Sequence, residues 1–551
     1  MAQIDEEIEN QTGLERIRRM HETMRWLLDR MLASAPGTHK VDFFRRRPPA
    51  GGRQICCGGL IVGSKSLIVV GAGMGGLSAA CYARLSGFDV KVFEAHNLPG
   101  GMCTSWKRSG YTFDGSIHHL AGCHPASPIY GMWEELGAMP RELVFSDHLT
   151  QVEDPDGRTV TVYTDLNRLE DHLQELFPAD GRWIRQYTSA LNRMVPHDLL
   201  ELPLTGYGGL LQHATVLPTL LRWGRVTMRA AAEKLTDPFF KAAFPVFQYA
   251  WPDIPALIHL NLLAQCVGRN YAFPVGGSLP FAQSIAARFA DLGGEIAYGA
   301  RVTQILIERG RAAGVVLEDG SEHRADAVIS NAFERKTTFD LLGGAHMDKA
   351  LRARMAEPQD NINMGTHICL GVDRDLTDEP HALVLLLEEP VQLADQMIDR
   401  LPIELFGQDP SLAPEGKGVI KVLLNASYRF WRDLHDDRAA YADAKAELAQ
   451  RVAELLDRRF PGLCAQVEVA DVATPVTTER FTGNERAYGV AQGFDPGVIF
   501  SRPRSSQEIR RLFWVGQSAG GAGIPGCAAQ GRGAVKLVCK ELGTRFGGRK
   551  L

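Results

Sequence analysis

The chain has 551 residues, of which 45% are hydrophobic and 23% are charged, and its formal net charge is −5. This length exceeds what one hydrophobic core serves, so we expect two domains and an extension. The slightly acidic balance, with a sequence pI near 6.4, argues against a nucleic-acid-binding protein, which would carry a basic patch. The cysteines form no Cys-x-x-Cys pair and no His/Cys group at zinc spacing, so the sequence predicts no metal site and a cytoplasmic location.

Residues 1–62 are expected to form an extension before the main fold. Apolar residues between Ile17 and Leu32 recur at spacings of three and four, which predicts an amphipathic helix followed by a linker. We expect its apolar face to dock on the protein's own body or on a second subunit of a homo-oligomer; peripheral attachment to a membrane is the alternative. The charged N-terminus lacks the apolar segment of a secretory signal, and no apolar stretch is long and unbroken enough to cross a bilayer.

The next segment carries the most informative motif of the chain. Residues 67–70 form a short, unbroken apolar run, which is typical of a buried parallel strand. The pattern G-x-G-x-x-G follows at Gly71, Gly73 and Gly76. The first glycine permits a tight turn, the second brings bare backbone to a pyrophosphate, and the third lets a helix pack close to the strand. That helix, expected from about Gly75, directs its N-terminal N–H groups and positive dipole end at the phosphates.

An acidic residue at the end of the following strand narrows the choice of dinucleotide. Residues 89–94 form this strand and end on Glu94, roughly 20 residues after the glycines. A carboxylate in this place bonds ribose hydroxyls and favours an unphosphorylated ribose, hence FAD or NAD over NADP. The order of strand, glycines, helix, strand and acid therefore predicts a dinucleotide site; a tight βαβ turn without a ligand is the alternative.

The residues after this acid favour FAD. A second glycine turn contains Gly100, Gly101 and Met102. An NAD site gives no reason for this turn, whereas a flavin extends further along the sheet edge and needs backbone access there. No second nucleotide motif follows, so the electron partner is expected to be oxygen, a quinone or another carrier instead of a tightly bound nicotinamide.

Three segments, 67–122, 271–332 and 511–542, together resemble the phytoene desaturase, carotenoid isomerase and retinol saturase family of FAD-dependent oxidoreductases, which has the amine-oxidase-like flavoprotein fold. The resemblance implies an α/β, Rossmann-like FAD-binding domain built from discontinuous segments. It also implies an inserted mixed α+β substrate domain. In this family the backbone near Arg301 and Val302 meets the adenine, and a C-terminal helix from about Ile524 faces the pyrimidine end of the flavin.

The same resemblance predicts further cofactor contacts, directly after a buried strand that ends at Gly516. Wider relatives often carry an acid after this glycine, whereas this chain has Gln517, so a neutral or backbone contact is expected there. The helix that follows would place partial positive charge beside the electron-rich reduced flavin.

Further elements and boundaries follow from periodicity and turn residues. Strands over 302–308, 311–318 and 322–329 are expected to form a meander, because Asp319-Gly320 is a strong hairpin signal, and residues 151–163 are expected to form another hairpin. The FAD-binding domain is expected to comprise residues 63–145, 271–335 and 506–551, and the substrate domain residues 146–270 and 336–505. Apolar clusters between residues 199 and 251 form either an ordinary helical core or a tunnel for a long apolar substrate.

His118 and His119 are the candidate catalytic residues, because they follow the segment that resembles the family's flavin-flanking turn and histidine titrates near neutrality. Each could instead bond backbone or the flavin edge. The expected activity is hydride exchange between flavin N5 and a hydrophobic isoprenoid or polyene, in desaturation, saturation or isomerisation. A flavin amine oxidase and a non-redox prenyl or lipid carrier of the same fold are the alternatives. An amine oxidase usually has aromatic residues that cage the amine, and this sequence lacks them at the expected place. A carrier would not need the intact glycine motif.

Overall fold

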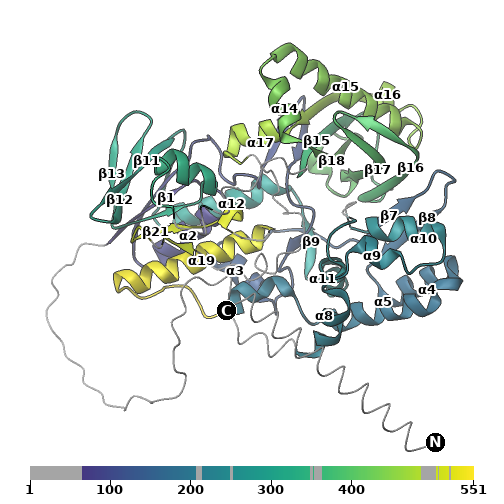
Figure 1. Cartoon of the computed structure of the whole chain (residues 1–551), viewed down its shortest axis with the longest axis horizontal. Coiled ribbons are helices and arrows are strands. Elements are labelled where there is room, and N and C mark those ends of the chain that lie inside the picture. Colours follow the sequence, from purple (N-terminus) through teal and green to yellow (C-terminus); the bar gives the residue numbers. More distant parts are fainter. Residues whose placement is uncertain are drawn as a thin grey trace, which may run out of the picture.

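The computed structural model describes residues 65–205, 214–248, 252–347, 352, 363–484, 504–506, 508–519 and 523–551. The expected N-terminal helix and linker lie outside these residues. Figure 1 shows a sheet with long helices beside it on one side of the molecule and a second, larger sheet on the other. A group of helices lies below the second sheet.

A six-stranded sheet contains the dinucleotide motif. Its strand order is β10-β2-β1-β14-β21-β20, and all neighbours are parallel except the antiparallel edge pair β21 and β20. Its strands are β1 (Ser66–Val70), β2 (Asp89–Phe93), β10 (Glu295–Ala297), β14 (Ala327–Ser330), β20 (Arg504–Ser505) and β21 (Leu512–Trp514). The central strand β1 is apolar because helices and the rest of the fold cover both of its faces.

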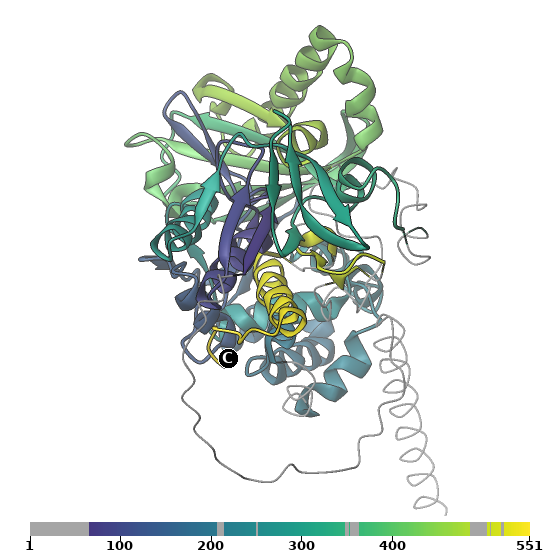
Figure 2. The same cartoon turned by 90° about the vertical axis from the view of Figure 1, so that its left-hand side faces the viewer.

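Three helices pack together beside this sheet: α2 (Met74–Leu85), α12 (Ser278–Asp291) and α19 (Gly523–Leu542). Figure 2 shows α19, in yellow, running alongside the sheet strands. The contact between α19 and α2 requires glycine at position 531, since a Cβ there would lie 2.3 Å from the Gly75 carbonyl oxygen and 2.7 Å from the Ala79 nitrogen. The sequence-predicted helices after the first glycine motif and near the C-terminus are confirmed.

The expected meander is present but ends earlier than predicted. It consists of β11 (Val302–Glu308), β12 (Arg311–Leu317) and β13 (Glu322–Arg324). The prediction of one strand over 322–329 was wrong, because β14 leaves the meander and pairs in parallel with β1. The Asp326 carboxylate, which accepts a hydrogen bond from the Ser66 backbone at 2.9 Å, fixes this change of sheet. The fully buried side chains of β14 belong in a covered parallel sheet, whereas those of β13 are exposed or half-buried.

A seven-stranded sheet forms the second part, in the order β19-β15-β18-β17-β16-β7-β8. Its strands are β7 (His148–Glu153), β8 (Thr159–Tyr163), β15 (Asn363–Val372), β16 (Ala382–Leu393), β17 (Gln396–Leu405), β18 (Gly418–Ala426) and β19 (Val467–Ala473). The predicted hairpin over 151–163 is confirmed as β7 and β8. Helices α14 (Tyr428–His435), α15 (Arg438–Asp457), α16 (Leu463–Gln466) and α17 (Pro475–Thr482) accompany this sheet.

Along the chain, a group of helices lies between β8 and β15 of this sheet. Its helices are α4 (Leu166–Leu176), α5 (Gly181–Met194), α6 (Leu202–Thr205), α8 (Leu217–Trp223), α9 (Met228–Ala232), α10 (Pro238–Ala243) and α11 (Ala256–Val267). Its aromatic side chains pack against one another: the Trp183 and Phe244 rings lie 4.8 Å apart, and the Phe177 and Phe240 rings stack at 4.3 Å. These aromatic residues therefore form a filled core, the first of the two interpretations of the apolar clusters.

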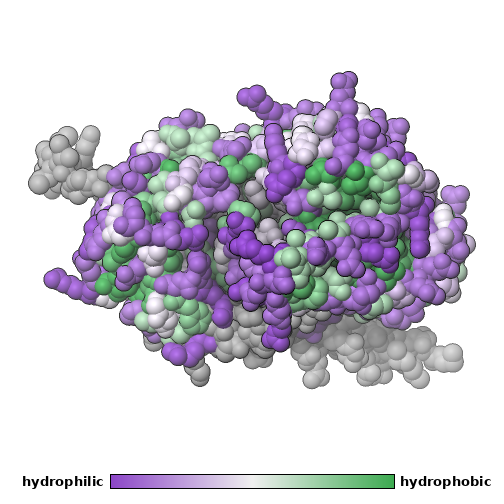
Figure 3. Space-filling view, turned by 90° about the horizontal axis from the view of Figure 1, so that it is seen from above, coloured by the Kyte–Doolittle hydropathy of each residue, from purple (hydrophilic) through white to green (hydrophobic). Residues whose placement is uncertain are grey.

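Short elements join the two sheets, and they carry the candidate histidines. They are the hairpin β3 (Ser105–Arg108) and β4 (Tyr111–Asp114), the strands β5 (Leu120–Ala121), β6 (Leu143–Val144) and β9 (Tyr271–Pro274), and helix α3 (Pro128–Glu135). Seen from above (Figure 3), hydrophilic side chains cover much of the surface and hydrophobic ones gather in separate patches. Of the helices within the described ranges, none has the length and apolar character needed to cross a bilayer.

Candidate cofactor site

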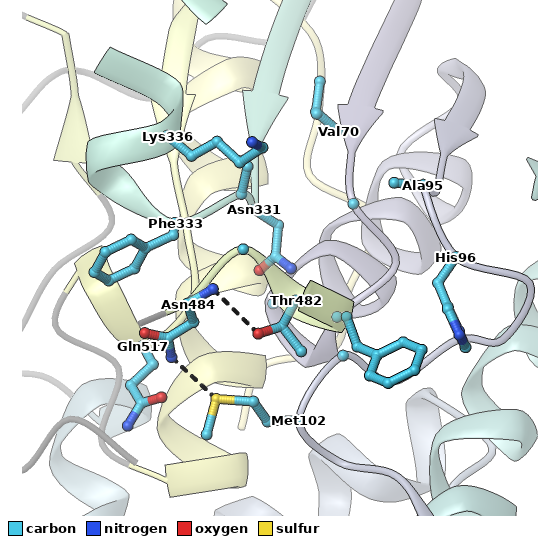
Figure 4. Close-up of a pocket in the computed structure, with 18 of the residues that line it drawn as sticks. Val70, Ala95, His96, Met102, Asn331, Phe333, Lys336, Thr482, Asn484 and Gln517 are labelled. Carbon is cyan, nitrogen blue, oxygen red and sulfur yellow. Dashed lines mark hydrogen bonds between the residues drawn. The ribbon is translucent and has the colours of Figure 1, made fainter. Parts of the chain in front are cut away.

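A cavity of about 510 Å³ opens where the central parallel strands end (Figure 4). Val70, Phe93, Asn331 and Gly516, which lie at or just beyond the carboxyl ends of β1, β2, β14 and β21, all line it. This edge of an open parallel sheet is where nucleotides bind in doubly wound folds.

The glycine turn gives the cavity a bare backbone wall. Gly71 has a φ of +93°, which lets the chain turn away from β1 without the strain that a side chain would bring. A Cβ on Gly76 would lie 2.0 Å from the Gly71 carbonyl oxygen, so this glycine allows α2 to start close against the strand. The N-terminus of α2 at Met74 lines the cavity, and the described first turn of α2 carries no acidic side chain. An anionic group there would therefore meet N–H donors and the positive end of the helix dipole.

Glu94 joins the end of β2 to the glycine turn. Its Oε2 accepts a hydrogen bond from the Ala72 backbone N–H at 2.6 Å, and its Oε1 accepts one from the His96 backbone N–H at 2.8 Å. The side chain is only 9% exposed, and its contacts to backbone donors are those of an ionised carboxylate. An ionised carboxylate has about four acceptor sites, so it retains acceptor capacity toward a hydroxyl in the cavity.

Asn331 is a site residue that the sequence analysis missed. Its side chain lies among the glycines: a Cβ on Gly73 would come within 2.5 Å of Asn331 Nδ2, and Cβ atoms on Gly75 and Gly516 would each come within 2.7 Å of Asn331 Oδ1. Figure 4 shows Asn331 near the middle of the labelled residues. The signal was present, because a polar residue directly after a buried strand at this sheet edge faces the ligand in such folds.

The structure brings together nearly all the predicted cofactor contacts. Those that line the cavity are Gly71, Gly73, Gly75, Glu94, Gly100, Gly101, Met102, Val302, Gly516, Gln517 and Ile524. Gly76 does not line it and serves the helix–strand contact instead. The wall includes both the second glycine turn and the start of α19.

A second missed group comes from the end of α17 and the residues after it. Glu479 to Asn484 line the cavity, although this segment lies far from the nucleotide motif in sequence. The Asn484 side-chain amide contacts the Met102 sulfur at 3.1 Å, and the Phe481 ring stands edge-on to the His96 ring at 5.1 Å between centroids. Phe481 is half-exposed, one of five exposed large apolar side chains among the residues that the structure describes. Sequence alone gave no indication that this segment would fold back over the cavity.

The two candidate catalytic histidines do not line the large cavity. Both lie in the loop between β4 and β5, two and three residues after Ser116, which does line it. They line a second cavity of about 20 Å³. Burial, together with the neighbouring His381 and His118, lowers the pKa of His119 to about 3, so His119 is neutral and only weakly basic at physiological pH.

The residues of the large cavity fit a dinucleotide, and in the described residues no three His, Cys, Asp or Glu side chains are placed to hold a metal ion. A carboxylate with free acceptor sites, a glycine turn that no side chain fills and two helix N-termini line one continuous space. These features match, in order, a ribose, a pyrophosphate and an electron-rich ring.

Comparison with known proteins agrees with this geometry. Residues 69–136 match the family described as NAD(P)-binding Rossmann-like domain. The prolycopene isomerase of Arabidopsis thaliana is 26% identical over 513 residues, which cover 86% of this chain and 83% of that protein. The lycopene-forming phytoene desaturase of Pseudescherichia vulneris is 24% identical, with 87% of this chain and all of that protein covered. The zeta-carotene-forming phytoene desaturase of Myxococcus xanthus is 28% identical, with 84% and 91% covered.

Solved structures show the same fold. An oxidoreductase from Methanosarcina mazei superposes with a TM-score of 0.52 at 21% identity and covers 86% of this chain and 99% of its own. A putrescine oxidase superposes with a TM-score of 0.54 at 14% identity, with the same coverage of both chains. The predicted fold class, a mixed α/β protein with a Rossmann-like domain, is confirmed. The predicted resemblance to carotenoid isomerases and desaturases is confirmed as well.

Proposed function

We propose, because this chain is a homologue of carotenoid isomerases and desaturases, that it is an FAD-dependent oxidoreductase acting on a hydrophobic isoprenoid or polyene. The observation that carries the proposal is the single cavity in which the glycine turn, Glu94, the second glycine turn and the start of α19 meet. Homology over most of the chain gives the substrate class, and the cavity gives the cofactor class.

Each part of FAD has a matching group in the proposed site. Glu94 would bond the ribose hydroxyls, the first turn of α2 would hold the pyrophosphate, and the backbone at Val302 would meet the adenine. Gln517 and the N-terminus of α19 would lie at the pyrimidine end of the flavin ring. The partial positive charge of that helix end would stabilise the reduced ring. FAD is favoured over NAD because these last groups have no role with a nicotinamide.

Bound flavin would supply the hydride chemistry, since it accepts or donates a hydride at N5. The protein's task is then to hold the polyene close to the ring, to exclude water and to receive or supply a proton. His118 is the better placed of the two candidate histidines for the proton, because burial leaves His119 only weakly basic. Desaturation, saturation and isomerisation all need this arrangement: desaturation would start from oxidised flavin, saturation would start from reduced flavin and oxidise it, and isomerisation would start from reduced flavin and leave it reduced.

The proposal includes the surroundings of the reaction. Oxygen or a quinone would take the electrons of a desaturation, and another, reduced carrier would give the electrons of a saturation. The protein would work in the cytoplasm, with peripheral contact to the membrane in which polyenes dissolve. We also propose the domain boundaries given from the sequence. They are supported because each of the three segments assigned to the FAD-binding domain contributes at least one strand to the six-stranded sheet.

An amine oxidase is the second candidate, and its support is the putrescine oxidase fold. That likeness, at 14% identity, concerns the fold alone. The aromatic residues expected to cage an amine are absent from the described stretch before α19, where Phe513 and Trp514 belong to strand β21 and are buried. The curated relatives therefore favour a polyene over an amine.

The test is to purify the full chain, record its visible spectrum and identify any cofactor released by denaturation. We expect flavin bands and FAD. Prolycopene, phytoene and zeta-carotene are then offered in liposomes, with either a quinone or chemically reduced flavin under anaerobic conditions. Product mass separates loss of two hydrogens, gain of two and isomerisation. A colourless protein that takes up no added FAD would refute the proposal and favour the carrier alternative.

A further inference from the structure

A buried ion network joins the candidate histidine to the seven-stranded sheet. His118 Nδ1 contacts Glu404 Oε1, at the end of β17, and Glu404 Oε2 pairs with the Lys421 ammonium of β18 at 2.5 Å. The Glu404 and Lys421 side chains are 7% and 1% exposed, whereas the His118 side chain is 21% exposed. The network thus extends from the buried Lys421 ammonium to the partly exposed His118 side chain.

The loop that carries His118 is tied to the same cation. The Lys421 ammonium donates a hydrogen bond to the Asp114 backbone oxygen at 3.0 Å, and the Asp114 carboxylate accepts one from the Ser278 hydroxyl at 2.8 Å. Ser278 Oγ in turn accepts from the Ile117 backbone N–H at 2.8 Å, one residue before His118. Both ends of the segment between Ser116, which lines the cofactor cavity, and His118 are therefore held in place.

Glu404 and Lys421 are both ionised in this network. Burial alone would raise the pKa of Glu404, but the His118 and Lys421 charges hold the pKa of this carboxyl well below its usual range. Burial opposes the Lys421 charge, yet the carboxylates of Glu404 and Asp114 raise the pKa of this ammonium. Glu404 is consequently an anion at neutral pH and a strong acceptor for an N–H of the imidazole.

Other ionisable groups beside the network are the buried Asp114 carboxyl and Cys369 thiol, which both interact with Lys421, and three buried histidines. Burial lowers the pKa of His367, on β15, to about 3, and it also lowers the pKa of His381, just before β16. His119 is neutral for the same reason. Of the charged groups in the network, Glu404 contacts His118 directly.

The second cavity offers a path by which a proton leaves His118. It is lined by His118 and His119, and also by three buried side-chain nitrogens without a hydrogen-bond partner, namely His148 Nε2, His381 Nε2 and Gln408 Nε2. Its volume of about 20 Å³ is enough for one water molecule, and a polar lining of this kind retains water. His381 Nδ1 contacts the Leu405 carbonyl at 3.0 Å, which leaves its Nε2 as an acceptor for that water.

We propose that His118 exchanges the proton of the reaction and that Glu404, kept ionised by Lys421, is the positioning residue that fixes the His118 ring. This inference rests on the proposed function. In a desaturation, bound oxidised flavin would take the hydride from one C–H bond of the polyene. The neighbouring carbon gives its proton to Nε2 of His118, and the electrons of that second C–H bond form the new double bond. Nδ1 stays protonated toward Glu404, and the proton leaves through water in the small cavity.

The test compares the FAD-loaded full chain with Glu404→Gln, Glu404→Asp and His118→Gln on whichever polyene the wild-type enzyme converts. We expect His118→Gln to lose about 10²- to 10⁴-fold in kcat/KM, the usual contribution of a proton-transfer group. Glu404→Gln should lose activity and move the pH profile of kcat/KM, whereas Glu404→Asp should recover part of the rate. Flavin absorbance should be unchanged in all three variants.

Two controls separate positioning from folding. Glu135→Gln removes an equally buried carboxylate, which accepts a hydrogen bond from the Tyr82 hydroxyl at 2.8 Å and is no partner of this network in the described contacts, and should leave the pH profile unchanged. The double variant Glu404→Gln/Lys421→Met avoids an unpaired buried ammonium and should remain slow with a shifted profile. A wild-type pH profile in Glu404→Gln or in the double variant would overturn the inference. A wild-type chain without FAD or without turnover would refute the proposed function itself, and the inference with it.

Discussion

The Glu94 carboxylate accepts a hydrogen bond from the Ala72 backbone N–H at 2.6 Å, so the acid directly after β2 holds the glycine turn that follows β1. Two strands that lie side by side in the sheet are thereby locked at the edge where the cofactor cavity opens. The residue that would bind ribose also shapes the loop that would bind pyrophosphate. Changes at this position should therefore affect both the cofactor and the fold.

Glu94→Gln should weaken FAD binding by about tenfold to a hundredfold, because hydrogen bonds to a charged acceptor contribute about 1.5–3 kcal/mol. The amide also directs an N–H group at a backbone or ribose donor. The dissociation constant is measured by titrating the apoprotein with FAD and following flavin fluorescence. Glu295→Gln, which changes a 69%-exposed side chain in the same sheet, is the control. Equal affinities in the two variants would contradict a ribose role for Glu94.

Asn331→Asp should lower FAD affinity by about tenfold or more, since it places a negative charge among the glycines expected to hold the pyrophosphate. The two side chains have nearly the same shape, so packing is preserved. Isothermal titration with FAD at two salt concentrations measures the effect, and salt should reduce the difference from wild type. Asn425→Asp, on an exposed position of β18, should bind FAD normally. Unchanged affinity in Asn331→Asp would place the phosphates elsewhere.

Gly531→Ala should destabilise the protein by about 1–3 kcal/mol, because its Cβ would lie 2.3 Å from the Gly75 carbonyl oxygen and force α19 away from α2. Both helices start at the cofactor cavity, so FAD retention should fall as well. Thermal unfolding with and without added FAD measures both effects. Gly181→Ala is the matched control, since the nearest atom to its Cβ is 3.6 Å away; alanine there should be neutral or stabilise by up to about 1 kcal/mol. An unfolding temperature in Gly531→Ala equal to that of the control would show that the helices separate at little cost.

Local sequence signals predicted the part of the cavity wall that lies within one short stretch of the chain, whereas Val302, Gly516, Gln517 and Ile524 were expected from the family resemblance. The glycine turn, α2 and Glu94 form one βαβ unit whose spacing reports its geometry. The end of α17 was missed because its place depends on how distant segments cross over the sheet edge, whereas Asn331 directly follows a buried strand and could have been found. The exact end of the meander was missed for a related reason: residues 322–329 carry two short strands that the sequence shows as one run, and only pairing with β1 separates them.

The ion network could not be predicted from the sequence. His118 was a candidate from its position after the flavin-flanking turn, but Glu404 and Lys421 each stand as a single charge within an apolar part of their strands, β17 and β18. A charge in such a run indicates either an exposed face or a buried pair, and periodicity does not distinguish them. The pairing depends on the register of β17 against β18, in which Glu404 stands opposite Lys421.

Glu201→Gln should make stability less sensitive to pH. Burial raises the pKa of the Glu201 carboxyl to about 7, opposed by the hydrogen bond from the Ser127 hydroxyl at 2.7 Å and aided by the Asp198 charge. A carboxyl that is more basic in the folded state binds more protons there than in the unfolded state between pH 4.5 and 7. Its contribution to stability is therefore present below this window and is lost as the pH rises through it.

Glutamine keeps an acceptor for Ser127 and carries no charge, so this variant should match wild type near pH 5 and exceed it in unfolding temperature near pH 8. Differential scanning calorimetry at these two pH values measures the difference. Glu447→Gln, on an exposed position of α15, should show no such pH-dependent gain. A Glu201→Gln variant that gains equally at both pH values would mean that Glu201 is already ionised at pH 5, against the direction that its burial produces.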